Sequence, residues 1–152
     1  MRSAFSPARL YGALALAEAV TWALLLIGMF LKYGPQVTEL GVRIGGGLHG
    51  FVFLAFVVAT VVVAIDQRWR AGELLLGLAS AIVPFATIPA ERWLLRRGKV
   101  GEQWRLREEP ARTAPEKLVS LAVRRPVPSA VIAVVLVAVV FSAMLVVGPP
   151  GS

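Results

Sequence analysis

The sequence predicts an all-α integral membrane protein, a bundle of four transmembrane helices with a basic cytoplasmic loop. Hydrophobic residues make up 57% of the 152 residues and charged residues 16%, whereas soluble domains average roughly 45–50% and 25%. Of the 16 basic and 9 acidic residues, 15 fall between positions 91 and 126, and Glu18 is the one charge inside an apolar run. The mean hydropathy of +0.74 excludes an ordinary soluble enzyme and a disordered chain.

Four apolar runs are the predicted spans: residues 10–31, 44–65, 74–90 and 127–147. A helix that crosses the hydrocarbon core needs about 20 residues, which the first, second and fourth runs supply. We therefore expect a three-span membrane core in residues 1–98, a polar basic loop in 99–126, and a fourth transmembrane helix with a short tail in 127–152.

The first run contains Glu18 near its middle, where a bare carboxylate costs several kcal/mol. Thr21 and Trp22 follow at three and four residues, and Tyr11 precedes at seven, so the four share one helical face that we expect to point into protein. One interpretation makes Glu18 a ligand for a proton or a cation. The other is a buried carboxyl group that fixes packing through a hydrogen bond to a neighbouring helix.

The second run begins with a glycine-rich segment that ends in His49. Gly46 and Gly50 have the four-residue spacing that lets helix backbones approach closely, which predicts tight contact with the first or third helix. His49 is then an interhelix hydrogen-bond donor; a cofactor ligand is the alternative. Straight antiparallel helices over the predicted runs place Glu18 and His49 about 12 Å apart in depth, so we expect no direct ion pair.

The third run is the shortest, with 17 residues. Its ends reach the interface through the side chains of Glu73 and Arg92, whose aliphatic stems can lie along the lipid. Pro84 removes one helical hydrogen bond, so we expect a kinked helix at this position.

The segment between the third and fourth runs is basic and interrupted by prolines. A short amphipathic helix over residues 116–124, with Leu118, Leu121 and Ala122 on one side, is one interpretation; a solvated linker is the other. The predicted contacts to anionic lipid or to a partner are Arg92, Arg96, Arg97, Lys99, Arg124 and Arg125. The fourth run lacks polar groups that could form a site, so we expect an anchor that faces lipid or a partner.

Basic residues in the loops predict the orientation. With four spans, both termini and the 66–73 connection lie on one side of the membrane and together carry four lysine and arginine residues. The other two connections lie on the opposite side and carry twelve. The long loop is therefore predicted to be cytoplasmic, with both termini outside. The net charge of +7 then reflects membrane orientation, and we expect no nucleic-acid partner.

Catalytic and cofactor chemistry has little support in the sequence. There is no cysteine and one histidine, which excludes disulfides, thiolate metal sites and bis-histidine haem. No nucleophile–base pair or phosphate-binding loop is present. We predict no catalytic residue, no metal, no cofactor and no enzymatic activity of its own, even within an oxidoreductase assembly.

Three segments carry a resemblance: residues 17–19, residues 43–51 with the glycine–histidine stretch, and residues 84–92. They resemble an actinobacterial family of small integral-membrane proteins of unknown function, over about residues 8–98. The chain is also similar to the accessory association factor of actinobacterial respiratory supercomplexes, which join a cytochrome bc-type complex to a haem–copper oxidase. That likeness implies a peripheral subunit of the electron-transport chain that holds no haem or copper.

These observations favour a non-catalytic accessory subunit that stabilises a larger complex in the bacterial plasma membrane, plausibly a respiratory supercomplex. Its partners are then other integral membrane subunits and lipids. The alternative is a small oligomeric transporter or channel component that uses Glu18 and His49 as titrating groups and Pro84 as a hinge. A third hypothesis is regulatory, with the basic loop bound to a cytoplasmic partner.

Overall fold

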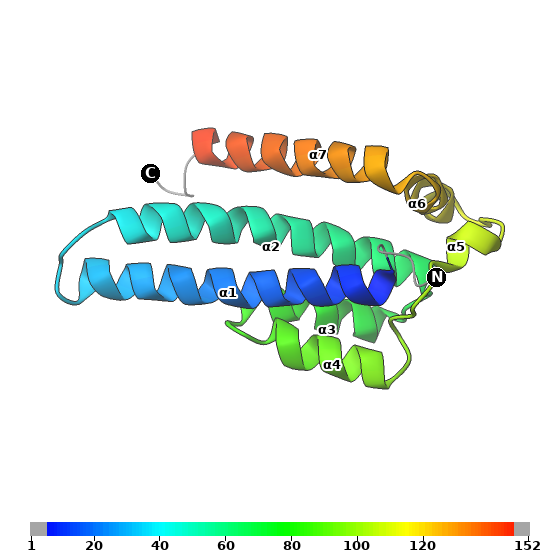
Figure 1. The fold of residues 1–152 in the computed structure, drawn as a ribbon, viewed down its shortest axis with the longest axis horizontal. Coiled ribbons are helices and arrows are strands. Elements are labelled where there is room, and N and C mark those ends of the chain that lie inside the picture. Colours follow the sequence, from blue (N-terminus) through cyan, green and yellow to red (C-terminus); the bar gives the residue numbers. More distant parts are fainter. Residues whose placement is uncertain (1–5, 148–152) are drawn as a thin grey trace.

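The computed structural model describes residues 6–147, and every regular element in that range is a helix. Helices α1 (Pro7–Tyr33), α2 (Leu40–Asp66) and α7 (Pro126–Val147) are long and apolar enough to cross a membrane. They run along the length of the molecule (Figure 1). The predicted spans 10–31, 44–65 and 127–147 are thus confirmed as apolar helices of sufficient length.

The ends of α1 are set by local chemistry. The Ser6 hydroxyl accepts a hydrogen bond from the Arg9 backbone N–H at 3.2 Å, and Pro7 occupies the first turn, where its missing N–H costs nothing. At the other end, the Gly34 N–H donates to the Phe30 carbonyl oxygen, and the proline that follows cannot continue the helix.

Helices α1 and α2 form a long antiparallel pair whose backbones touch near their connection. A Cβ atom on Gly28 would collide with the backbone of Gly41, and one on Gly45 would lie 2.9 Å from the Leu24 carbonyl oxygen. Glycine is therefore required at these positions for the close approach. This contact fixes the register of the two helices.

The glycines predicted to make this contact have other roles. A Cβ atom on Gly46 would meet only the Leu25 side chain, at an ordinary 3.7 Å. One on Gly50 would lie 2.9 Å from the ring of Phe141, so Gly50 makes room for α7 rather than for the first or third helix. The close packing of α2 on α1 therefore depends on Gly41 and Gly45, which also have the four-residue spacing.

The predicted third span, 74–90, is not a single helix. Helix α3 (Ala71–Ile82) ends before Pro84, and α4 (Thr87–Arg96) begins after a turn. Because a residue before proline avoids the helical region, Val83 is extended at φ −95° and ψ 124°. Pro84 therefore ends the helix instead of kinking it. The twelve residues of α3 reach about 18 Å, which is short of the ~30 Å hydrocarbon core.

Helices α3 and α4 form a hairpin that enters the bundle and returns to the same end (Figure 1). The Trp22 indole N–H donates to the Ala81 carbonyl oxygen at 3.2 Å, near the end of α3. The Thr87 hydroxyl donates to the Ala15 carbonyl oxygen at 2.9 Å, at the start of α4. The tip of the hairpin is thus held against the middle of α1. A chain reversal at membrane depth is tolerated where protein surrounds the backbone.

The hairpin changes the topology that four spans had predicted. The Ala8 N–H donates to the Gly101 carbonyl oxygen at 3.1 Å, so the start of α1 and the long loop lie at the same end of the molecule. The prediction that the long loop and the amino-terminal end lie on opposite sides is therefore wrong. The physical reason is that the chain reverses at residues 83–86 instead of crossing.

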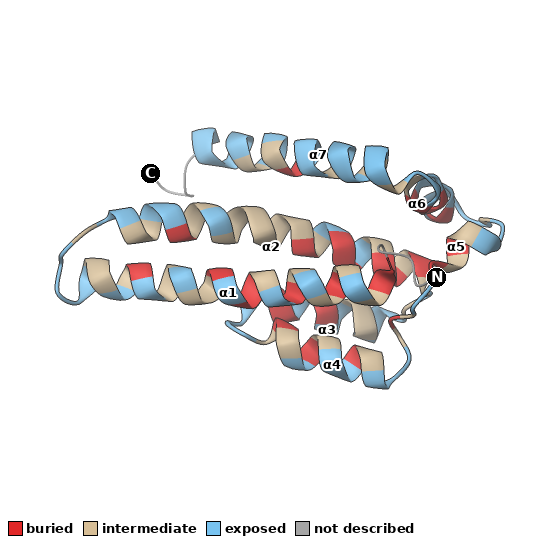
Figure 2. Cartoon of the chain, viewed as in Figure 1, coloured by how far each residue is buried: buried red, intermediate tan, exposed pale blue. Residues whose placement is uncertain are grey.

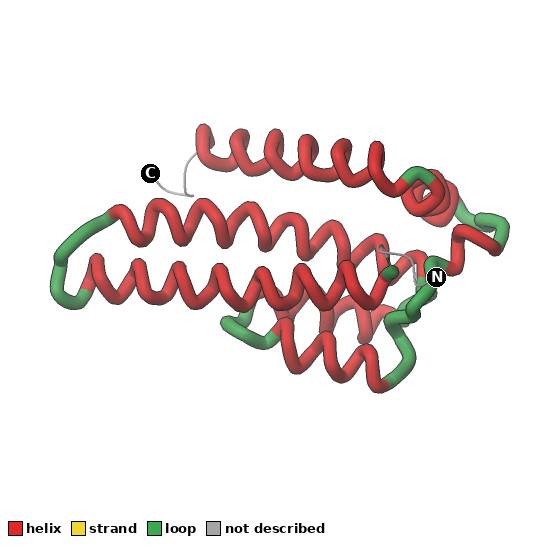
Figure 3. The backbone as a smooth tube through the Cα atoms, in the orientation of Figure 1, coloured by secondary structure: helices red, strands yellow, loops and turns green. Residues whose placement is uncertain are grey.

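The segment 99–126 is folded against the end of the bundle, which corrects the solvated-linker interpretation. It contains α5 (Arg105–Glu108) and α6 (Ala114–Arg124), joined by short loops (Figure 3). The predicted amphipathic helix corresponds to α6. Its buried face carries Val119 and Val123, while Leu118 and Leu121 are exposed.

Helix α7 is packed much less than the other long helices. Val137 is its one buried residue among those described, and Figure 2 shows α7 exposed along most of its length. It contacts α2 and α6. The predicted anchor role of this helix agrees with so little burial, because its apolar side chains are free to face lipid.

Candidate functional site

The tip of the α3–α4 hairpin and helices α1 and α2 enclose a buried polar cluster. Glu18 of α1 is at its centre and is 0% exposed. Neither of its carboxylate oxygens has a hydrogen-bond partner among the described residues. A carboxylate that is buried in this way is costly, because it has lost water without gaining donors. Glu18 is therefore the least satisfied polar group of the membrane-spanning part that the structure describes.

His49 of α2 lies directly opposite Glu18. Its Nδ1 atom is 3.8 Å from Glu18 Oε1 and 3.3 Å from the Thr21 hydroxyl oxygen. The Thr21 hydroxyl is also 3.0 Å from the Glu18 carbonyl oxygen, to which it donates. The ring of Trp22 lies 4.3 Å from that of His49, centroid to centroid. Three neighbouring residues of α1 thus hold the imidazole.

The expectation that Glu18 and His49 are about 12 Å apart in depth is wrong. It assumed that α1 and α2 pair symmetrically about the polar residues 32–43. In the structure α2 begins at Leu40, and the glycine contact between Gly28 and Gly41 sets the register. That register brings His49 about two turns closer to the level of Glu18.

The Glu18–His49 pair can hold one proton in two arrangements. Either both groups are neutral, or a carboxylate faces an imidazolium. The neutral arrangement leaves two uncharged polar groups in a buried site. The charged arrangement is an ion pair with 3.8 Å between His49 Nδ1 and Glu18 Oε1. Gain or loss of a proton changes the charge of the pair by one unit. The site is thus a proton-binding geometry, and its two partners come from different helices.

Further polar groups lie along α1, between this cluster and the end of the molecule that carries the 99–126 segment. Tyr11 is 1% exposed and its hydroxyl has no hydrogen-bond partner among the described residues. Gly12 lies beside Glu91 of α4, since a Cβ atom there would be 3.1 Å from Glu91 Oε1. Thr60 of α2 is also buried and donates to the Phe56 carbonyl oxygen. The α1 face predicted from Glu18, Thr21, Trp22 and Tyr11 therefore does point into protein.

Metal binding has no support in this cluster. Within residues 6–147, no group of three or more histidine, aspartate or glutamate side chains is close enough together to hold a metal ion.

The basic residues predicted to contact anionic lipid or a partner are distributed around the end of the molecule that carries the 99–126 segment, and they do not form one cluster. Arg92, Arg96, Arg97, Arg124 and Arg125 are exposed. Lys99 Nζ forms an ion pair with Glu73 at 2.8 Å, which ties the end of α4 to the start of α3. Arg97 lies over the Trp93 ring at 4.9 Å.

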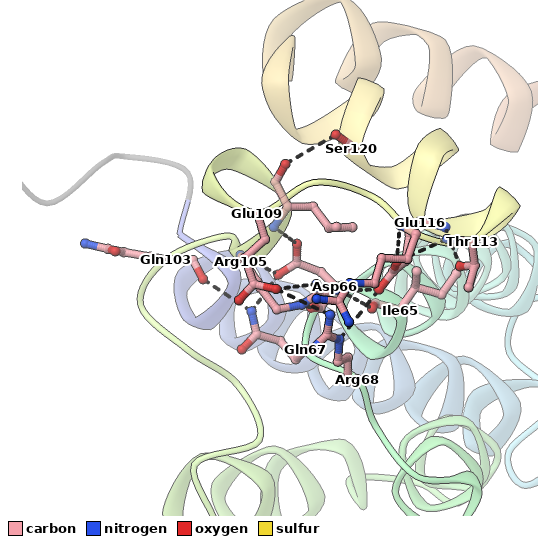
Figure 4. A network of polar contacts seen from close by, with 12 residues as sticks. Ile65, Asp66, Gln67, Arg68, Gln103, Arg105, Glu109, Thr113, Glu116 and Ser120 are labelled. Atoms are coloured by element: carbon pink, nitrogen blue, oxygen red, sulfur yellow. Dashed lines mark hydrogen bonds and ion pairs between the residues drawn. The ribbon is translucent and has the colours of Figure 1, made fainter.

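A second polar cluster, which the sequence did not predict, holds the 99–126 segment in place (Figure 4). Asp66, at the end of α2, is 0% exposed. Its carboxylate accepts hydrogen bonds from the backbone N–H groups of Arg105 and Leu106, both at 3.0 Å. It also accepts one from the Gln67 side chain at 2.6 Å. Asp66 thus caps the amino-terminal end of α5 from another helix.

Arg105 links this cap to α6. Its guanidinium group contacts Glu116 at 2.7 Å and Glu109 at 3.0 Å. Glu116 also accepts from the backbone N–H of Arg112 at 2.8 Å. These donors, the Arg112 N–H first and then the Arg105 guanidinium, lower the pKa of Glu116 to about 2. Glu116 therefore stays ionised at any pH above that value and keeps the segment docked.

Sequence reasoning had one signal for this second cluster. Asp66 follows directly on an apolar run and is the one aspartate of the chain, but the backbone N–H groups that it caps are about 40 residues away. Thr87 was missed in the same way, because its acceptor is a carbonyl group of α1. Neither pairing leaves a local pattern.

The fold and the buried pair define the class: a helical membrane protein with three helices long and apolar enough to cross a membrane, a short hairpin and a buried carboxylate. The chain belongs to the family described as domain of unknown function DUF3817, whose model matches residues 8–96. This confirms the resemblance to an actinobacterial family of small membrane proteins. The matched segment covers α1 to α4 and contains Glu18, His49 and the hairpin, whereas α5 to α7 lie outside it.

A relative from Streptomyces coelicolor, whose name describes it as a membrane protein, is 51% identical over 88 residues. Those residues are 57% of this chain and 10% of the relative, so the chain spans about a tenth of the length of the curated relative that it matches. No solved structure matches the chain.

Proposed function

We propose that this protein is a proton-binding membrane component, in the class of small transporter or channel components, with the Glu18–His49 pair as its proton site. The observation that carries the proposal is the 3.8 Å contact between a fully buried carboxylate and an imidazole on the next helix. Ionisable residues inside a membrane are costly and are typical of ion and proton sites.

The hairpin supports the same proposal. It reaches α1 on both sides of Glu18, through the hydrogen bonds at Ala15 and Trp22. Interrupted helices that end at mid-membrane beside charged groups are typical of the substrate and ion sites of transporters. A tip held by two hydrogen bonds also gives the site a part that can move without unfolding a whole span.

Infrared spectroscopy of the purified protein tests proton binding at Glu18. A carboxyl group without hydrogen bonds absorbs apart from solvated ones, so we expect a protonated-carboxyl band whose intensity changes with pH. The band should be absent from Glu18→Gln. It should persist in Glu39→Gln, which removes an exposed carboxylate near the α1–α2 connection.

A band that survives in Glu18→Gln, or one that does not change with pH, contradicts the proposal. Proton flux into vesicles, driven by a potassium diffusion potential, extends the test to transport. We expect Glu18→Gln to abolish any flux that the parent protein shows.

A second function, that of a non-catalytic accessory subunit in a larger membrane complex, is favoured by α7. This helix is a 22-residue apolar span with one buried residue among those described, so most of its surface is available to a partner helix. The S. coelicolor relative carries the matching segment within a chain about ten times its length, which agrees with a module that acts beside other domains. A role in a respiratory supercomplex stays a prediction.

Purification of the tagged protein from its native membrane in mild detergent tests the accessory role. We expect stoichiometric integral membrane partners, and haem absorption if the partner is a respiratory complex. A chain that elutes without partners contradicts the accessory role.

The charge distribution favours one orientation in the plasma membrane. Lys32 and Arg43 lie near the α1–α2 connection, whereas the other 13 basic residues in the described range lie towards the opposite end. Under the positive-inside rule, this opposite end is cytoplasmic. The start of α1 then lies on the cytoplasmic side together with α5 and α6. The four-span prediction placed Arg9 on the outer side, against the positive-inside rule. In the proposed orientation Arg9 lies on the cytoplasmic side, in agreement with that rule.

A further inference from the structure

The part of helix α7 nearest α6 is separated from α1 and α2 by an apolar groove of about 280 Å³. One wall is α7, where small residues such as Ala130 and Ala133 face the groove. The opposite wall comes from α1 and α2, with Leu14 and Ala55 among its residues. Because the alanines on both walls are small, the helices leave a space that their own side chains do not fill.

The groove has one polar end. Arg107 of α5 is the one charged residue in its lining, and Ser129 at the start of α7 lies on the same lining. Arg107 Nε donates to the Val123 carbonyl oxygen at 2.8 Å, which fixes the guanidinium group at this end. Arg124 and Arg125, which directly follow Val123 in the chain, are exposed.

Among residues 6–147, the charge of Arg107 is not balanced by a carboxylate. No described carboxylate forms an ion pair with it, whereas Arg105, two residues earlier, is paired with both Glu109 and Glu116. The two terminal guanidinium nitrogens of Arg107 therefore retain donors for an anion, in a geometry that suits phosphate. A fixed, unpaired cation at the end of a carbon-lined groove complements an amphiphile with an anionic head.

The size of the groove distinguishes a lipid from a helix. Because α7 also contacts α2 directly, the two walls of the groove meet, and a helix about 10 Å across does not fit between them without displacing α7. An acyl chain is much thinner and can lie along the alanine-lined wall.

We propose that the groove binds one anionic phospholipid from the leaflet on the side of α5 and α6, with its phosphate at Arg107 and an acyl chain between α7 and the α1–α2 pair. The bound lipid fills the space under α7 and holds this helix against the bundle. This site is separate from the Glu18–His49 pair, so either proposal can fail without the other.

Native mass spectrometry of the full chain tests the proposal. The protein is reconstituted into vesicles of equal phosphatidylglycerol and phosphatidylcholine, then extracted, and the retained lipids are counted. We expect one retained phosphatidylglycerol, preferred by about tenfold or more, as hydrogen bonds to a charged group imply. Arg107→Gln should reduce the preference to near one. Arg112→Gln, which removes an exposed arginine between α5 and α6 at the same end, should leave it unchanged.

Ala133→Phe fills the groove from α7 and should abolish retention of either lipid. Equal retention of the two lipids by the parent protein overturns the proposal. So does an equal loss of preference in Arg107→Gln and Arg112→Gln, or unchanged retention in Ala133→Phe.

A measurement on the parent protein alone keeps the test independent of how the variants fold. Phosphatidylglycerol with a photoreactive group in its acyl chain should crosslink mainly to residues 129–137 of α7. Crosslinks spread evenly over the exposed apolar faces of α1, α2 and α7 overturn the proposal.

Discussion

Replacement of His49 with leucine is expected to lower the free energy of unfolding by about 1–3 kcal/mol, the cost of leaving a buried polar group without its partner. The imidazole lies 3.8 Å from Glu18 Oε1, and leucine leaves the carboxyl group without it. Equilibrium unfolding in mixed detergent micelles, followed by the loss of helical circular dichroism, measures the change.

The double variant Glu18→Leu, His49→Leu is the matched control for this prediction. It removes both polar groups, so it should recover most of the lost stability, because replacement of both partners of a buried polar pair with apolar groups of similar shape can be nearly neutral. The change at His49 should therefore be small in the Glu18→Leu background. An equal loss in both backgrounds means that the two residues are not coupled, and contradicts the pairing.

Replacement of Asp66 with alanine is expected to release the 99–126 segment from the end of the bundle. Two backbone N–H groups of α5 lose a charged acceptor, and hydrogen bonds to charged groups contribute about 1.5–3 kcal/mol each. The expected loss is therefore about 3 kcal/mol or more in the docking of α5. The rate of trypsin cleavage within this segment, in reconstituted vesicles, measures the release.

Two further variants provide a control and an intermediate case for this prediction. Glu102→Ala removes an exposed carboxylate from the same segment, so its cleavage rate should equal that of the parent. Asp66→Asn keeps the shape and one acceptor oxygen, and its rate should fall between those of the parent and of Asp66→Ala. Equal rates in Asp66→Ala and Glu102→Ala contradict the capping role of Asp66.

The spans that agreed with prediction are those decided by local composition. A run of about 20 apolar residues suffices to specify a transmembrane helix, and the runs at 10–31, 44–65 and 127–147 meet that requirement. The run at 74–90 was wrongly predicted to be a single span, because apolar content does not specify whether a chain continues across the membrane or reverses. Pro84 marked the break correctly, but a kink and a reversal share that signal, and the bonds at Ala15 and Trp22 favour the reversal.

The candidate site shows the same division. Glu18 was evident from the sequence, because it is the one charge inside an apolar run, and its helical face with Thr21 was predicted correctly. Its partner was not, because the prediction placed His49 at another depth. An error of about two helical turns in register is enough to separate the two groups, and hydropathy does not specify register to that accuracy.

The sequence by itself determined that this chain belongs in a membrane, that it is helical, and that Glu18 is its costly residue, because each of these follows from composition and local periodicity. Only the tertiary structure decided what Glu18 faces, where the chain reverses and which end carries the charge. These outcomes depend on contacts between distant segments: Gly28 with Gly41, Ala8 with Gly101, and Asp66 with the start of α5. Such contacts have no local signature, because each residue in them is compatible with several neighbours until the helices pack.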